Sequence, residues 1–266
     1  MTETTVRYAS LAESATAPRV VPFAPRTGGA SELAPERIGL AGGDAQRKMR
    51  PGKSATPDPR YRRLLGERAW WALPVEVRRR FSRHLGAGEA IVYRGEVVLT
   101  ELSRVGWLIA QAARLIGGPL PFTADATGPA VVTVTEEPAL NGQIWSRQYP
   151  RPGGFPQVIH SAKRFTGPIG LEEYLGQFWG LGLVMRLSMH VEDRTLVFRS
   201  AGYALEFGGR RAFALPRWLW PGRCEIRHRA ETDHRFSFSL SLEHPLLGRL
   251  IHQVAFFEDE TGEPSC

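Results

Sequence analysis

Two histidines could act as acid–base groups because each stands in a row of otherwise apolar residues. On strand-like alternation, the row of His228 contains Cys224, Ile226 and Ala230, and the row of His252 contains Leu250, Val254 and Phe256. An imidazole titrates near neutral pH, so either group could serve as a general acid or base, or bind the polar end of a ligand. A hydrogen-bonded histidine in a packed core accounts for the same pattern.

A second group with chemical potential is formed by Trp145, Arg147 and Tyr149, which share one face of a predicted strand. If that face is concave, an arginine between two aromatic rings is a polar handle for the acidic head group of a mostly apolar ligand. If it is convex, the three residues form an ordinary cross-strand ladder. His160 and Arg164 lie on the next predicted strand and could join either arrangement. Phe238 would line the pocket or fill a core.

Recognisable catalytic motifs are absent from the sequence. It contains no G-x-S-x-G, G-x-x-x-x-G-K-[ST] or H-E-x-x-H motif, and we assign no catalytic residue, metal site or cofactor. Glu225 and His228 are three positions apart on a predicted strand, which sends them to opposite faces and excludes a metal pair. The cysteines, Cys224 and Cys266, lack metal-ligand spacing and cannot form a disulfide framework.

Alternating apolar and polar residues predict that most of the chain forms antiparallel strands. The expected fold class is α+β and mostly antiparallel β: a strongly curved sheet or partly closed barrel of about eight strands, with two amphipathic helices. Asn141-Gly142 predicts a tight hairpin turn. The parity of the apolar rows predicts a two-residue turn at Asp193-Arg194 and a three-residue loop at 232–234. The segment 167–180 is expected to be irregular or briefly helical.

Two helices should accompany the strands. The first opens at Pro74 and carries a basic cluster that we expect mostly on its wet face: Arg78, Arg79, Arg80 and Arg83. The second is capped by Ser103 and ends at Gly117. Its apolar stripe, which we expect to pack on the sheet or close a barrel end, contains Val105, Leu108, Ile109, Ala112, Leu115 and Ile116. A membrane-surface role for this helix is the alternative.

Composition divides the chain near residue 60. Residues 1–60 are rich in Ala, Pro and Gly and predict a disordered tail, whereas residues 61–266 predict a single β-rich domain. No stretch approaches the roughly 18 to 20 apolar residues of a membrane span, and no secretory signal is visible, so we expect a cytoplasmic protein. The net charge is +7, but the arginines are spread along the chain, and we predict no specific nucleic-acid partner.

Several segments resemble the bacterial family called domain of unknown function 4166, over roughly residues 61–258. The segments are Trp71-Ala72-Leu73-Pro74, 142–147, 178–191, Leu215-Pro216-Arg217-Trp218 and Pro245-Leu246-Leu247-Gly248. The resemblance implies a domain that stands alone or follows a saccharopine-dehydrogenase-like domain. It implies no activity, cofactor or catalytic residue. This sequence has no G-x-G-x-x-G motif after a strand and therefore no recognisable dinucleotide fold before residue 61.

We therefore expect noncatalytic binding of a small hydrophobic or amphipathic ligand in the concavity of the sheet. The candidate ligand-binding residues are Trp145, Arg147, Tyr149, His160, Arg164, His228, Phe238 and His252. One alternative is an isomerase, cyclase or hydrolase that uses His228, His252 or His160 as its general acid or base. Another is an accessory module that docks a redox enzyme through Trp218 and Trp220.

Overall fold

The computed structural model describes residues 57–86, 88–168, 170–178, 181–207 and 210–259. The predicted disordered tail therefore lies outside the described residues up to position 56, as does Cys266.

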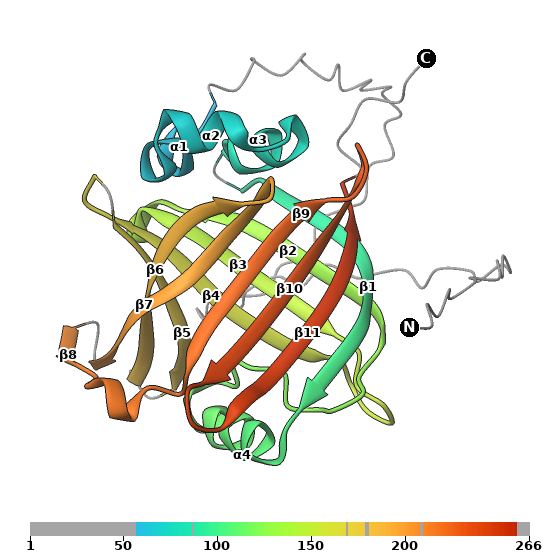
Figure 1. The fold of residues 1–266 in the computed structure, drawn as a ribbon, viewed down its shortest axis with the longest axis vertical. Helices are drawn as coiled ribbons and strands as arrows, with labels where there is room; N and C mark the ends of the chain where they lie inside the picture. Colours follow the sequence, from blue (N-terminus) through green and yellow to red (C-terminus); the bar gives the residue numbers. More distant parts are fainter. Residues whose placement is uncertain (1–56, 87, 169, 179–180, 208–209, 260–266) are drawn as a thin grey trace, which may run out of the picture. The chain divides into compact units, whose positions relative to one another are not determined.

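Ten antiparallel strands close into a barrel, and an eleventh short strand, β8 (Arg210–Ala214), pairs with the end of β7 (Figure 1). Neighbouring strands follow the chain from β1 to β7; β7 then pairs with β9, and β11 returns to β1. The ring strands are β1 (Ala90–Leu102), β2 (Gly128–Glu137), β3 (Gly142–Tyr149), β4 (Gln157–Thr166), β5 (Gly170–Phe178), β6 (Leu181–Glu192), β7 (Thr195–Phe207), β9 (Arg223–Ala230), β10 (Arg235–His244) and β11 (Gly248–Glu258).

The prediction of about eight strands in a partly closed barrel thus underestimated the number of strands and the closure of the barrel. The segment 167–180, expected to be irregular or briefly helical, contains β5. Its two adjacent acidic residues, Glu172 and Glu173, interrupt the alternation of apolar and polar residues that indicates a strand. The two side chains leave opposite faces, and each meets a cation: Glu172 pairs with Arg164 outside the barrel, and Glu173 pairs with Lys163 inside it. β5 supplies the link between β4 and β6 that allows the barrel to close.

The predicted registers are confirmed. Phe238 pairs with His228 across β10 and β9, and the bond from Glu231 N to Arg235 O closes the three-residue loop. Met189 pairs with Phe198 across β6 and β7. In the turn between these strands Asp193 and Arg194 have φ of 46° and 62°, as a type I′ turn requires. The β2–β3 hairpin is also confirmed, although its connection includes a 3₁₀ turn, η2 (Pro138–Leu140), before Asn141-Gly142.

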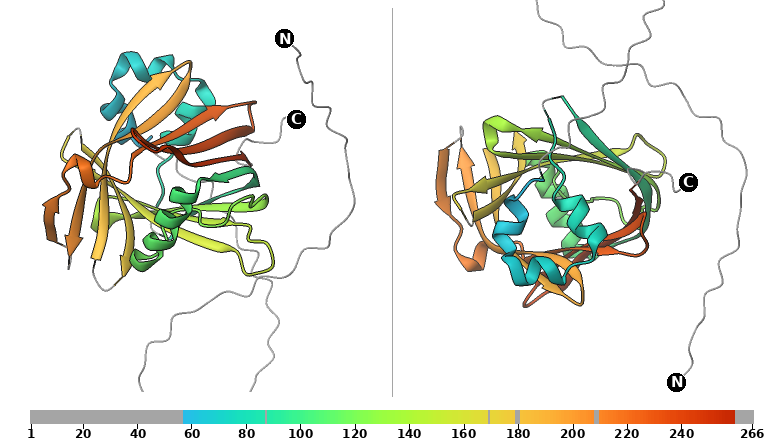
Figure 2. Two further views of the ribbon diagram at one scale, coloured as in Figure 1. Left: turned by 60° about the horizontal axis from the view of Figure 1, so that its bottom comes forward. Right: turned by 90° about the horizontal axis from the view of Figure 1, so that it is seen from above.

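Three short helices cover one end of the barrel (Figures 1 and 2). They are α1 (Arg60–Leu65), α2 (Glu67–Ala72) and α3 (Val75–Phe81), and the last confirms the helix predicted after Pro74. Tyr61 and Phe81 enter the barrel, where the Tyr61 ring lies 5.1 Å from that of Phe81 and 5.0 Å from that of Phe165. Arg80 does not lie on the solvent-exposed face of α3 on which the sequence placed it. It is 6% exposed, and its guanidinium lies 3.6 Å from the Phe236 ring centroid.

The other end of the barrel carries α4 (Arg104–Ala113), followed by the 3₁₀ turn η1 (Arg114–Ile116). The predicted cap is confirmed, because the Ser103 hydroxyl accepts from the Gly106 amide at 3.0 Å. The predicted packing stripe is mostly wrong: Ile109 packs against the core, but Leu108 and Leu115 are 59% and 75% exposed, while Gly106 and Ala110 are buried. A Cβ at Gly106 would lie 1.9 Å from the Leu250 carbonyl oxygen, so the helix packs on β11 through its smallest residues.

Among the described residues, no helix has the length and apolar character needed to cross a membrane.

Candidate functional site

A cluster of polar side chains lies inside the barrel on three adjacent strands. Register places Arg147 of β3, Ser161 and Lys163 of β4, and Glu173 of β5 on neighbouring inward positions. The Ser161 hydroxyl donates to Glu173 Oε1 at 2.6 Å and accepts from Arg147 Nη1 at 2.9 Å. Lys163 Nζ lies 3.1 Å from Glu173 Oε2, and Arg147 Nη2 lies 3.4 Å from Glu173 Oε1. The four residues, which we call the interior cluster, are each at most 7% exposed.

The interior cluster contains two basic groups and one carboxylate. Burial alone would raise the pKa of Glu173, but the charges of Lys163 and Arg147 and the Ser161 hydrogen bond outweigh it and lower that pKa to about 2. Burial lowers the pKa of Lys163, and the attraction of Glu173 only partly opposes this. Glu173 is therefore ionised at neutral pH, and one positive charge is left over whenever Lys163 is protonated.

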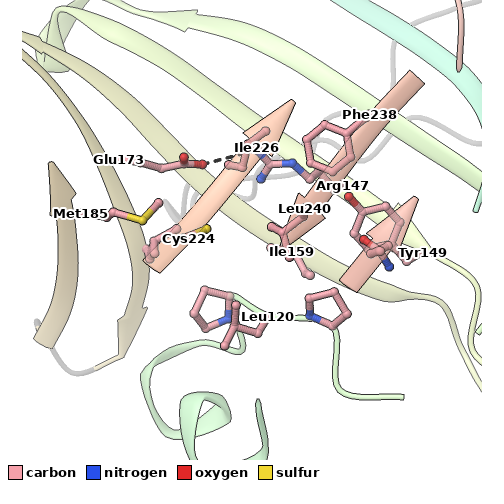
Figure 3. A pocket seen from close by; sticks show the side chains of 14 residues that line it. Leu120, Arg147, Tyr149, Ile159, Glu173, Met185, Cys224, Ile226, Phe238 and Leu240 are labelled. Carbon is pink, nitrogen blue, oxygen red and sulfur yellow. Dashed lines mark hydrogen bonds and ion pairs between the residues drawn. The ribbon is translucent and has the colours of Figure 1, made fainter. Parts of the chain in front are cut away.

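A small cavity adjoins this cluster toward the α4 end (Figure 3). Arg147 and Glu173 form its polar side, and Tyr149, Ile159 and Leu240 belong to its apolar wall. Its volume of about 40 Å³ has room for two or three water molecules. That is far below the roughly 300 to 1,000 Å³ of small-molecule sites. The concavity expected from the sequence is therefore mostly filled by side chains.

A loop closes this cavity on the α4 side. Its lining on this side consists of Pro119, Leu120 and Pro121. The side-chain amide of Gln157, on the barrel wall, holds the loop by donating to Leu120 O at 2.7 Å. The same side chain accepts from the Phe122 amide at 3.4 Å. Gln111 of α4 donates to Phe122 O at 3.2 Å. We call residues 119–121 the lid, because a ligand larger than the cavity must displace it.

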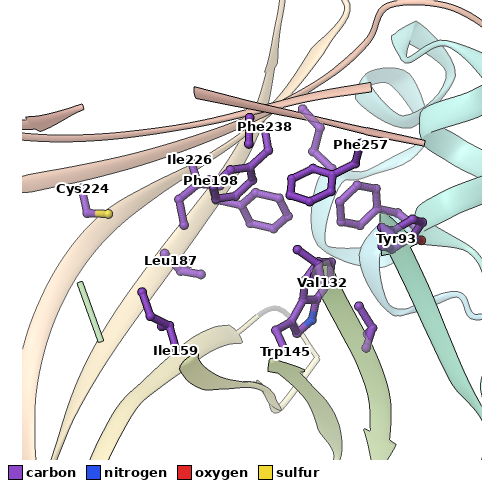
Figure 4. Packing of buried hydrophobic residues seen from close by; sticks show 14 of the residues in the cluster. Tyr93, Val132, Trp145, Ile159, Leu187, Phe198, Cys224, Ile226, Phe238 and Phe257 are labelled. Carbon is purple, nitrogen blue, oxygen red and sulfur yellow. The ribbon is translucent and has the colours of Figure 1, made fainter. Parts of the chain in front are cut away.

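Aromatic rings fill the half of the barrel nearer α1–α3 (Figure 4). His228 stands among them, 5.1 Å from the ring of Phe81 and 5.3 Å from that of Phe238, beside a void of only about 10 Å³. Burial, reinforced by the positive charges nearby, lowers its pKa well below 6.5, so the imidazole is neutral. Its Nδ1 has no hydrogen-bond partner among the described residues. A reacting group has no room beside it in this conformation.

The predicted ligand-binding residues divide between the two faces of the barrel wall. Trp145, Arg147, Tyr149, His228 and Phe238 are buried and line the interior voids. His160, Arg164 and His252 point outward and cannot join the others. His160 Nδ1 lies 2.7 Å from Ser146 Oγ, Arg164 pairs with Glu172 and Glu206, and His252 Nδ1 lies 2.9 Å from Ser241 Oγ. His252, Val254 and Phe256 are therefore on the outer face of β11, whereas Leu250, at the register shift between β10 and β11, is fully buried in the core.

Sequence reasoning missed Lys163, Glu173 and Ser161. A signal was present, because lysine occurs only at positions 48, 53 and 163 in a chain that otherwise uses arginine. The odd-numbered residues of β4 form its inward row, which includes Ser161 and Lys163. Once the register is known to pair Arg147 with Ile159, parity selects Ser161 and Lys163 instead of His160 and Arg164.

The remaining candidates have other surroundings. Burial raises the pKa of the Cys224 thiol to about 12, so this cavity-lining group is unreactive at neutral pH. Trp218 is 78% exposed, whereas Trp220 packs on Tyr203 at 5.4 Å and donates to Leu215 O. Within the described ranges, no group of three His, Cys, Asp or Glu side chains could hold a metal ion.

Comparison with known proteins identifies the family but not an activity. The model of the family "Domain of unknown function (DUF4166)" matches residues 73–257, and the chain belongs to this family. No curated protein matches. Among solved structures, the chain is similar to "Crystal Structure of Rv2717c from M. tuberculosis", with 13% identity and a TM-score of 0.39 over 71% of this chain and 99% of that one.

Proposed function

We propose that this member of the family binds a small anionic ligand with an apolar body inside the barrel. The anionic group, a carboxylate or its equivalent, binds Arg147, and the apolar body lies along Tyr149, Ile159 and Leu240. Lys163 does not line the cavity and adds positive charge from the far side of Glu173. The observation that carries the proposal is the interior cluster itself, in which two buried basic groups share one buried carboxylate beside an apolar cavity.

An unbalanced buried charge is unfavourable, and this is why the cluster favours an anion. Removing a charged group from water costs several kcal/mol unless an opposite charge and hydrogen bonds offset that cost. Glu173 already bonds to three neighbours, namely Arg147, Ser161 and Lys163. A ligand carboxylate would supply the second negative charge. It would also favour the protonated form of Lys163, whose pKa is lowered in the free protein.

The size of the ligand depends on the lid. With the lid in place, the cavity of about 40 Å³ admits only a few heavy atoms. Displacing residues 119–121 would break the hydrogen bond from Gln157 to Leu120 O, disturb the one that Gln157 accepts from the Phe122 amide, and expose the apolar wall beneath them. A carboxylate of four or more carbons has at least six heavy atoms and therefore requires an open lid.

A ligand panel tests the proposal. We expect carboxylates of four to eight carbons to raise the melting temperature of the full chain in proportion to the logarithm of their concentration, and alcohols of equal length to leave it unchanged. Native mass spectrometry should show a single bound carboxylate. Equal responses to acids and alcohols, or no response to either, would contradict the proposal.

An arginine pair provides the matched variants. Arg147→Met should abolish the carboxylate response, whereas Arg164→Met, which removes the outward arginine of the next strand, should retain it. If Arg147→Met fails to fold, the comparison of acids with alcohols on the unmodified chain still decides the question.

A second candidate function is protein docking at η3 (Arg217–Leu219), because Trp218 and Leu219 are 78% and 48% exposed. Trp218→Ser should abolish capture of a partner enzyme by the immobilised protein. Phe213→Ser, which removes another exposed ring, should not. Equal capture by both variants would count against this candidate.

A further inference from the structure

The outward face of α4 and η1 combines exposed apolar side chains with arginines. Trp107, Leu108 and Leu115 are 46%, 59% and 75% exposed, although a helix this close to a barrel usually buries its largest apolar residues. They lie between Arg104 at the beginning of the helix and Arg114 at the start of η1. We call these five residues the α4 surface.

The packing of α4 on the barrel fixes this orientation. Gly106 must face β11, because a Cβ there would lie 1.9 Å from the Leu250 carbonyl oxygen, and Ala110 is buried one turn later. With 3.6 residues per turn, the side opposite Gly106 and Ala110 is then the side of Leu108 and Leu115. Figure 1 shows α4 at the end of the barrel opposite α1–α3.

The arginines of this surface are not neutralised. Arg104 and Arg114 have no ion pair to a carboxylate in the part of the chain that the structure describes; Arg114 instead bonds to Gln111 Oε1 at 2.9 Å and stacks on Phe122. Nearby, Arg151 approaches the same ring and is also exposed. Two carboxylates lie nearby: Glu101 is paired with Arg249 at 3.0 Å, and Asp125 is exposed next to Ala124 of the adjoining loop.

We infer that the α4 surface binds an anionic lipid bilayer. Leucine and tryptophan side chains would enter the boundary between head groups and acyl chains, and the arginines would reach lipid phosphates and carboxylates from the ends of the helix. A hollow of about 420 Å³ beside Arg104, Trp107 and Leu108 would receive a head group. A second copy of this chain fits less well, because its Arg104 and Arg114 would be brought against their own equivalents.

This inference goes beyond the proposed function, because it concerns the outer surface and does not depend on a ligand inside the barrel. The test is cosedimentation of the full chain with vesicles of phosphatidylglycerol and phosphatidylcholine, compared with pure phosphatidylcholine vesicles. We expect binding to the anionic vesicles only, decreasing as salt rises from about 50 to 300 mM because the Debye length shortens.

Two double variants separate the apolar and the charged contributions. Leu108→Gln with Leu115→Gln should lower the partition coefficient by more than about tenfold, since each leucine loses part of its transfer free energy. Arg104→Ser with Arg114→Ser should lower it by about thirtyfold, at roughly fivefold for each arginine near the surface. Melting temperatures measured alongside verify that both variants fold.

The controls lie at the opposite end of the barrel. Val75→Gln changes a helix residue that is 59% exposed, as Leu108 is, and Arg63→Ser with Arg68→Ser removes the same charge; both should bind like the unmodified chain. Equal binding to neutral vesicles, or α4 variants that bind normally, would overturn the inference. So would a dimer in analytical ultracentrifugation that Leu108→Gln disrupts in a chain that binds no vesicle.

Discussion

Lys163 Nζ lies 3.1 Å from Glu173 Oε2 at directly paired positions of β4 and β5, and both side chains are only 2% exposed. A barrel wall normally turns apolar residues inward at such positions. This ion pair, with Arg147 beside it, gives the interior a charged end next to the cavity and an aromatic end around His228.

Removing the carboxylate should be more damaging than its size suggests. Glu173→Gln leaves Arg147 and Lys163 buried with no carboxylate between them, and we expect the free energy of unfolding to fall by about 3 to 5 kcal/mol. Urea unfolding measures this value. The control is Glu243→Gln, at an exposed position of β10, for which we expect a change within about 0.5 kcal/mol. A loss below about 1 kcal/mol for Glu173→Gln would show that Glu173 is not needed to compensate the buried charges of Arg147 and Lys163.

Acidification should destabilise the protein through His228. Its pKa in the folded state is well below 6.5, so below pH 6.5 the unfolded chain binds a proton that the folded chain does not. The free energy of unfolding should therefore fall as pH falls below 6.5, with a contribution from His228 that approaches about 1.4 kcal/mol per pH unit once the unfolded histidine is fully protonated.

His228→Phe removes this contribution and should flatten the stability profile between pH 6.5 and 5. His160→Phe, on the outer face of β4, is the matched control and should retain the slope of the unmodified protein. If His228→Phe retained that slope as well, the neutral state assigned to the buried imidazole would be wrong.

A helix-favouring substitution should be unfavourable in α4. Gly106→Ala would ordinarily stabilise a helix by up to about 1 kcal/mol, but here the new methyl group meets the Leu250 carbonyl oxygen. We expect a net loss of about 1 to 3 kcal/mol, by analogy with overpacked cores. Thermal unfolding, with exposed Ala112→Gly as the reference, measures it. A stabilised Gly106→Ala protein would contradict the close packing of α4 on β11.

The lid should loosen when Gln157 is changed. Gln157→Ala removes the bonds to Leu120 and Phe122, and each such bond contributes about 1 kcal/mol. Hydrogen exchange at the Phe122 amide should accelerate by about fivefold or more. Gln148→Ala, at an exposed position of β3, should leave that rate unchanged. Unchanged exchange in Gln157→Ala would mean that packing alone holds residues 119–121.

Strand parity predicted much of this fold, and its failures have physical causes. The pairs of Met189 with Phe198 and of His228 with Phe238 follow from alternation and turn chemistry, both of which are local properties of the sequence. β5 was missed because Glu173 faces inward, where only Lys163 on another strand makes a carboxylate tolerable. Such compensation between strands is invisible before their register is known.

The predicted site shows the same division. Trp145, Arg147 and Tyr149 were correctly placed on one face, but the sequence could not show which face of β4 would join them. The orientation of α4 was missed for a related reason. Its apolar stripe predicts that Leu108 is buried. Leu108 is exposed instead, because the close backbone contact of Gly106 with Leu250 turns the other side of the helix toward β11.

The central claim is that the barrel interior binds an anion at Arg147, next to the buried Lys163. A crystal of the full chain grown with 6-bromohexanoate tests it directly, because anomalous scattering locates the bromine without reference to the protein density. We predict a bromine peak among Tyr149, Ile159 and Leu240, with the carboxylate on Arg147. Bromine peaks on the outer surface alone, at concentrations that saturate the thermal response, would contradict the claim.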